Sequence, residues 1–136
     1  MVHQTFLPPQ EIEVHYIIPA LRRELALSMK KNGLKQNKIA ELLQIEDATV
    51  SQYINKKRGN KVTFDAVVLQ EIDQSSHLIK DKLSLLQEMQ RLLRVIKETR
   101  NICQIHKQLS SIPGECTPEL IDCFGGDNYG HARLRN

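Results

Sequence analysis

Apolar residues recur at every third or fourth position through much of the chain, which is the spacing of one face of an α-helix. This spacing predicts helices over residues 18–31, 36–43 and 47–56. Pro19 suits the first turn of the first helix, because the N–H that proline lacks is not needed there. Asn32-Gly33 ends that helix. The two adjacent prolines further upstream, in a stretch of mixed polarity, predict that residues 1–17 form an extended arm.

The second half of the pattern predicts one further helix and then a long seam. Thr63 or Asp65 can cap the further helix. Its expected core residues are Phe64, Val67, Val68, Leu69 and Ile72. The periodicity weakens at residues 74–76, where we expect a break or a bend. Residues 78–110 then predict one long helix or two, with apolar positions alternating in steps of four and three. The seam consists of Leu85, Met89, Leu92, Ile96, Thr99, Cys103 and His106.

The seam needs a partner surface, because a long apolar stripe beyond a compact helical domain must be buried somewhere. In a chain of 136 residues, a second copy is the economical partner. We therefore predict a homodimer. Its expected contact residues are Leu85, Met89, Leu92 and Ile96.

The composition also favours an all-α fold. Only 4% of the residues are aromatic, and Leu, Lys, Gln and Glu are abundant, as is common in helices. No apolar run approaches the ~20 residues of a membrane-spanning helix, and the N-terminus lacks the apolar region of a signal peptide. We therefore expect a cytoplasmic protein with no membrane partner.

The positive charge is concentrated in the first half of the chain. The net charge is +3 overall, but residues 1–62 carry ten Lys and Arg against six Asp and Glu. Residues 63–102 carry six of each sign, and residues 103–136 carry three against four. This asymmetry indicates an anionic partner for the first half.

The helices at 36–43 and 47–56, joined by a short turn, match the spacing of a helix-turn-helix. In that motif the first helix crosses the phosphate backbone and the second enters the major groove of DNA. The second helix needs small or hydrogen-bonding residues at its exposed N-terminal end. The chain places there Asp47, Ala48, Thr49, Ser51 and Gln52. The expected inward residues are Val50, Tyr53 and Ile54. Gln52 can make a bidentate contact with adenine.

The flanking residues suit phosphate groups. Gln36 opens the first helix of the motif, where free N–H groups and the helix dipole favour an anion, and Lys38 lies nearby. Four cations follow the second helix and can neutralise phosphates. They are Lys56, Lys57, Arg58 and Lys61. Glu46 and Asp47 oppose an anion, although one of them can cap the second helix.

The stretch "GLKQNKIAELLQIEDATVSQYINKKRG" resembles the Xre/Cro-type helix-turn-helix. More narrowly, it resembles a small, largely archaeal group of prokaryotic transcriptional regulators with a C-terminal Cys-bearing segment. The resemblance rests on Gln36, Ala40, residues 50–53 and residues 57–59, and it covers about residues 18 to 62. The family usually has Gly in the turn, in the left-handed conformation, where this chain has Gln44. A Gln there costs about 1 kcal/mol or bends the turn differently.

The three cysteines all fall in the last third of the chain. Cys103 and His106 are spaced i, i+3, while Cys116 precedes and Cys123 follows a short helix predicted at 118–122. Three thiolates and an imidazole suffice for an iron–sulfur cluster or a tetrahedral zinc ion. We predict the cluster, because thiols on either side of this short helix lie about 9 Å apart. A cluster spans more space than one zinc ion does. Structural zinc, redox-active thiols and inert cysteines stay open as alternatives.

These features together predict a homodimeric transcriptional regulator that binds a pseudo-palindromic double-stranded DNA operator and senses redox or iron–sulfur status. The expected division is an arm (1–17), a helix-turn-helix domain (18–75), a dimerisation region (76–110) and a Cys-rich segment with a tail (111–136). An antitoxin-like module that binds another protein is the alternative. We expect no enzymatic activity, because the chain lacks a Gly-rich phosphate loop and paired carboxylates.

Overall fold

The computed structural model describes residues 7–99 and 101–109, and within these ranges the chain is helical with no strand. The all-α fold class is thereby confirmed. In chain order the elements are α1 (Pro9–Ile12), the π-helix η1 (Glu13–Ile17), α2 (Ile18–Lys31), α3 (Gln36–Leu43), α4 (Asp47–Ile54), α5 (Ala66–Leu78), α6 (Lys82–Glu98) and α7 (Asn101–Leu109). The predicted bounds of α2 and α3 are confirmed, whereas α4 ends two residues earlier than expected.

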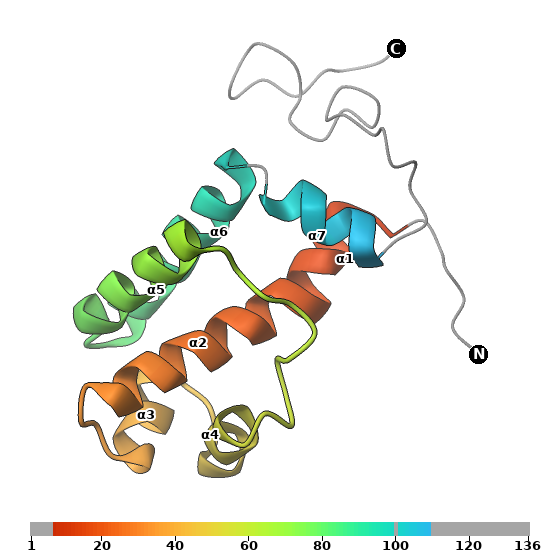
Figure 1. The fold of residues 1–136 in the computed structure, drawn as a ribbon. Coiled ribbons are helices and arrows are strands. Elements are labelled where there is room, and N and C mark those ends of the chain that lie inside the picture. Colours follow the sequence, from red (N-terminus) through yellow and green to blue (C-terminus); the bar gives the residue numbers. More distant parts are fainter. Residues whose placement is uncertain (1–6, 100, 110–136) are drawn as a thin grey trace, which may run out of the picture.

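The prediction of an extended arm is wrong for residues 9–17. Pro9 occupies the first turn of α1, and the chain stays helical through η1 and α2 to Lys31. Ile12 and Ile17 are fully buried on this segment, and α1 packs against α7 (Figure 1). Pro19 therefore lies inside a longer helical run, and the wider π-helical turn directly precedes this residue, which has no N–H to donate.

The central element is α2, which contacts η1, α3, α4 and α5 (Figure 1). Its buried residues recur at helical spacing, as the apolar pattern predicts. They are Ala20, Leu21, Leu25, Ala26 and Met29. Because α3 and α4 pack on one part of α2 and α5 on another, α2 fixes how the two short helices are presented.

The predicted break at residues 74–76 is absent, because α5 continues to Leu78. Ser75 and Ser76 are buried, and both hydroxyls have partners. The Ser75 hydroxyl donates to Glu88 Oε1 at 2.7 Å, and Asn32 Nδ2 donates to Ser76 Oγ at 3.3 Å. Small polar residues thus weaken the apolar pattern without ending the helix. Of the predicted core of this helix, Phe64, Val68 and Ile72 are buried, whereas Val67 and Leu69 are exposed.

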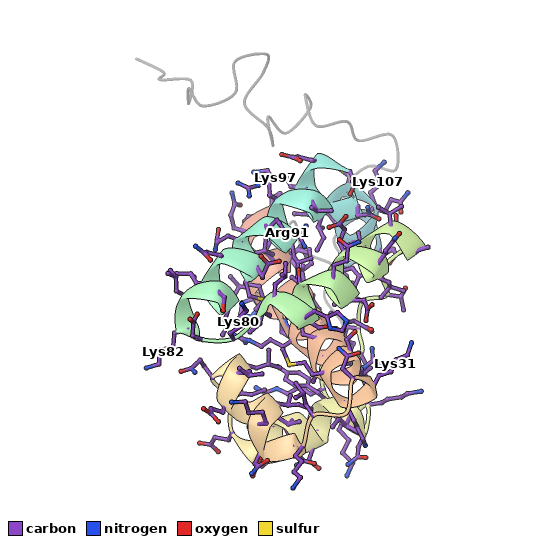
Figure 2. All side chains as sticks on the ribbon, turned by 90° about the vertical axis from the view of Figure 1, so that its left-hand side faces the viewer. Lys31, Lys80, Lys82, Arg91, Lys97 and Lys107 are labelled. Carbon is purple, nitrogen blue, oxygen red and sulfur yellow. The ribbon has the colours of Figure 1, made fainter. Side chains whose placement is uncertain are left out.

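Arg91, on α6, binds polar side chains of α5 where the two helices are in contact (Figure 2). Its guanidinium forms ion pairs with Glu71 at 2.5 Å and Glu88 at 3.1 Å. It also donates to Ser75 Oγ at 2.6 Å. Partial desolvation opposes the charge of Arg91, but hydrogen bonds to the two carboxylates outweigh it and raise the pKa of the guanidinium above its usual value. This network makes α6 part of the same packed unit as α5.

The region predicted as one long helix or two is two helices, α6 and α7. Thr99 Oγ1 donates to Val95 O at 2.7 Å where α6 ends. Leu92 and Ile96 are only 0% and 1% exposed in the single chain. The prediction that these two residues contact a second copy is therefore wrong. The physical reason is that α6 packs on α5, α7 and α3 within the chain, so these two residues are buried without a second copy.

Candidate nucleic-acid interface

The two short helices α3 and α4 are held together at their starts by one side chain. Gln36 Nε2, at the beginning of α3, donates to the main-chain oxygen of Asp47 at 3.1 Å. This hydrogen bond joins residues eleven positions apart and links the first turns of both helices. The Gln36 amide that sequence reasoning places near a phosphate therefore also sets the spacing between the two helix N-termini.

The outward face of α4 carries the residues that sequence reasoning places there. Val50 and Tyr53 are buried, at 0% and 2% exposure, and Ile54 is half-buried. Every candidate base-contacting side chain is at least partly accessible. Asp47, Ala48 and Gln52 are exposed, and Thr49 and Ser51 are half-buried. The start of α4 is thus a polar, accessible surface on a rigid apolar base.

Glu46 and Asp47 do not cap α4 as expected. Glu46 is the N-cap residue, and no side chain forms the cap hydrogen bond there. The first N–H groups of α4 are therefore not taken up by a capping carboxylate of the helix itself.

Three consecutive helices end in the same way. After each helix comes a residue in the left-handed conformation, whose N–H donates to the carbonyl oxygen three positions back. The N–H of the next residue donates to the carbonyl oxygen five positions back, which completes the Schellman pattern. The left-handed residues are Gly33 after α2, Gln44 after α3 and Lys56 after α4, with φ of 92°, 56° and 60°. Only the first is glycine. Of the two alternatives left open for Gln44, a left-handed residue or a differently bent turn, the structure has the left-handed residue.

Replacing Gln44 with Gly is expected to raise the free energy of unfolding by about 1 kcal/mol, because glycine adopts this conformation without the steric cost that a side chain adds. Urea unfolding of the purified chain measures the change. Gly33→Ala is the matched control, since no atom lies within 4 Å of the added Cβ; it is expected to lower stability by about 1 kcal/mol. If Gln44→Gly lowered stability as Gly33→Ala does, the steric cost assigned to the side chain of Gln44 would be contradicted.

The turn that follows α4 is held against α2. Gly59 has φ of 71°, and a Cβ at this position would lie 2.7 Å from Pro19 O and 3.1 Å from Arg23 Cβ. Asn60 Nδ2 donates to Lys56 O at 2.9 Å and closes the turn from its other side. The basic residues of this turn are therefore carried on a fixed backbone.

The cations of this turn are exposed. Among the described residues, none forms an ion pair with Lys56, Lys57, Arg58 or Lys61. Lys38 lies 3.7 Å from Glu41, but both side chains are at least half exposed, and such surface pairs contribute little. These positive charges remain available to an anionic partner that approaches α3 and α4.

The candidate metal ligands are only partly within the described residues. Cys103 is half-buried on α7, and Cys116 and Cys123 lie outside the described residues. The part of the chain that the structure describes holds no group of three or more His, Cys, Asp or Glu able to bind a metal. His106 is 4% exposed, and its Nε2 contacts Leu7 O at 2.5 Å. Because a carbonyl oxygen only accepts, Nε2 carries the hydrogen and is not free to bind a metal.

Sequence reasoning missed an apolar groove between α2, α3 and α6. It has a volume of about 460 Å³ and is lined by Ile18, Arg22, Leu43, Gln44, Lys82, Leu85, Leu86, Met89, Gln90 and Leu93. Of the four predicted dimer contact residues, the two that are only half-buried, Leu85 and Met89, lie here. The apolar pattern contains the signal for this groove, since Leu86 and Leu93 widen the predicted seam.

Comparison with known proteins identifies no relative. No family model, no curated protein and no solved structure matches the chain. Within the described ranges, no helix combines the length and the apolarity needed to cross a membrane.

Proposed function

We propose that this chain is a sequence-specific DNA-binding transcriptional regulator that inserts α4 into the major groove. The observation that carries the proposal is the division of α4 into two sides. Val50 and Tyr53 are buried, while Gln52 and its polar neighbours face outward at the end that a groove-entering helix presents to bases.

The electrostatics support the same direction of approach. Lys57, Arg58 and Lys61 follow α4 on a turn whose backbone is fixed by Gly59. A polyanion that lies along the start of α4 passes these charges. Gln36, at the first turn of α3, offers an amide beside unpaired helix N–H groups. The resemblance to Xre/Cro-type regulators agrees with this placement.

We propose further that two copies act together, because one α4 covers half of a pseudo-palindromic site. The exposed apolar residues of α6 are the available contact surface. Leu83 and Leu86 are 63% and 60% exposed, and Leu86 also lines the groove described above. Because Leu86 is exposed at the groove, a two-fold pairing can seat Leu86 of each copy in the groove of the other.

Removing Lys57 or Lys61 is expected to weaken binding to DNA of any sequence. The slope of log K against log salt should become shallower by about 0.9 for each phosphate that is no longer neutralised. Fluorescence anisotropy with a labelled duplex between about 50 and 200 mM salt measures this slope. The matched control is Lys107→Ala on α7, at the far end of the molecule from α3 and α4 (Figure 2). If the variants at Lys57, Lys61 and Lys107 all gave the same salt slope, the placement of DNA beside Lys57 and Lys61 would be contradicted.

We also propose that Cys103, Cys116 and Cys123 bind an iron–sulfur cluster that regulates the dimer, with zinc as the alternative. The support is chemical, because cysteine thiolates are the usual protein ligands of such clusters. Iron, sulfide and zinc analysis of protein purified without oxygen tests this. A colourless chain free of iron contradicts the cluster, and zinc at one ion per chain favours the alternative.

A further inference from the structure

Arg58 differs from the cations on either side of it. Its guanidinium carbon lies 6.0 Å from the centroid of the Tyr53 ring, and its Nη1 lies 3.5 Å from Gln52 Oε1. Both partners belong to α4, so Arg58 lies alongside the helix and not beyond its end. Neither Lys57 nor Lys61 has such a contact with a described residue.

The backbone brings Arg58 back to α4. Lys56 adopts the left-handed conformation, and the N–H of Lys57 donates to Gln52 O at 2.8 Å, which reverses the chain at the helix end. Gly59 then lies against Pro19. Since the backbone of the turn is held before and after Arg58, the chain brings this residue back beside Gln52.

The contact with Arg58 orients the amide of Gln52. Because Oε1 of Gln52 faces the guanidinium at 3.5 Å, one of the two acceptor positions of the amide oxygen is turned to Arg58, and Nε2 remains a donor. Arg58 itself has only donors. The two exposed side chains together therefore offer mainly hydrogen-bond donors, with one positive charge, to whatever approaches this part of α4.

We propose that Arg58 and Gln52 form one base-reading unit and that this unit selects guanine. The inference rests on the proposed function and names the base class that this site takes. Guanine presents two acceptors, O6 and N7, in the major groove, and the planar fork of arginine matches them. Adenine presents a donor beside its acceptor. A bidentate contact of Gln52 with adenine, which the residue type alone predicts, would have to share the Gln52 oxygen that faces Arg58.

A conservative substitution separates base reading from phosphate neutralisation. Arg58→Lys keeps the charge but removes the fork and its stacking on Tyr53. The matched control is Lys107→Arg, which makes the reverse change on an exposed residue of α7, at the far end of the molecule from α3 and α4 (Figure 2). The full chain and both variants are used to enrich a random duplex library, and their affinities for the enriched duplex and for random duplex are then measured.

We expect the unaltered chain and Lys107→Arg to enrich the same sequence, with guanine at one or more positions of each half-site. Arg58→Lys is expected to lose that guanine and to bind the enriched duplex about 10- to 100-fold more weakly. Its affinity for random duplex should stay within about twofold, because the charge is conserved.

Two outcomes overturn the inference, and they are distinguishable. If Arg58→Lys enriches the same sequence with the same affinity, Arg58 does not read bases, while DNA binding itself stands. If the unaltered chain enriches no sequence, both the proposed function and this inference fail. Circular dichroism of each variant establishes that the helices are intact.

Discussion

Gly59→Ala is expected to lower the free energy of unfolding by about 3 kcal/mol, since a left-handed residue with a side chain costs about 1–2 kcal/mol and overpacking adds about 1–3 kcal/mol. The overpacking arises because the new Cβ would meet Pro19 O at 2.7 Å, and this oxygen belongs to the backbone of α2 and cannot rotate away. Urea unfolding followed by circular dichroism gives the difference.

Gly33→Ala separates the two contributions to this destabilisation. Gly33 is also left-handed, but an added Cβ there meets no atom within 4 Å. It should therefore show only the conformational part, about 1 kcal/mol. Equal effects at Gly33 and Gly59 would mean that the turn after α4 does not rest against α2, and the fixed position of its cations would have no support.

Leu92→Ala is expected to lower the free energy of unfolding by about 3 kcal/mol, the range for a buried leucine that leaves a cavity. Leu92 is fully buried in the single chain, without a second copy. The stability of the single chain, measured by urea unfolding at low protein concentration, should therefore fall regardless of the oligomeric state.

Leu86→Ala on the same helix is the matched control. Leu86 is 60% exposed, so its truncation should change the stability of the single chain by no more than about 0.5 kcal/mol. Sedimentation should instead show weaker self-association, because Leu86 lies on the proposed contact surface. If Leu92→Ala dissociated the dimer and left the monomer as stable as before, Leu92 would be a dimer contact after all.

The elements that sequence reasoning predicted well are those whose signals are local. Residues 36–43 carry a complete apolar stripe and match α3 at both ends. Asn32-Gly33 contains the glycine that the end of α2 uses. The inward positions of Val50 and Tyr53 follow from helical spacing alone.

The errors arise where the partner is distant in sequence. The prolines before α2 suggest an extended arm, but α1, which carries the buried Ile12, packs against α7, about ninety residues further along the chain. Ser75 and Ser76 weaken the local pattern, yet Glu88 and Asn32 satisfy them. The periodicity shows that a stripe is buried, but it does not specify which surface covers it.

The candidate site shows the same limit. Residue types and spacing predicted which side chains of α4 face outward, but not that Gln36 bridges to Asp47 or that Arg58 folds back onto α4. Both contacts depend on left-handed turns at Gln44 and Lys56, where the residue types give no local signal. The apolar groove depends on how α6 lies across α2 and α3.

DNA recognition is tested most directly by the equilibrium affinity of the full chain for its enriched duplex and for a scrambled duplex of the same length and composition, at one fixed salt concentration. A regulator that reads bases with α4 should bind the enriched duplex at least about 10³-fold more tightly, and Gln52→Ala should remove much of that difference. Affinities for the two duplexes within about twofold of each other, well below the usual specificity ratio, would contradict sequence-specific recognition by α4.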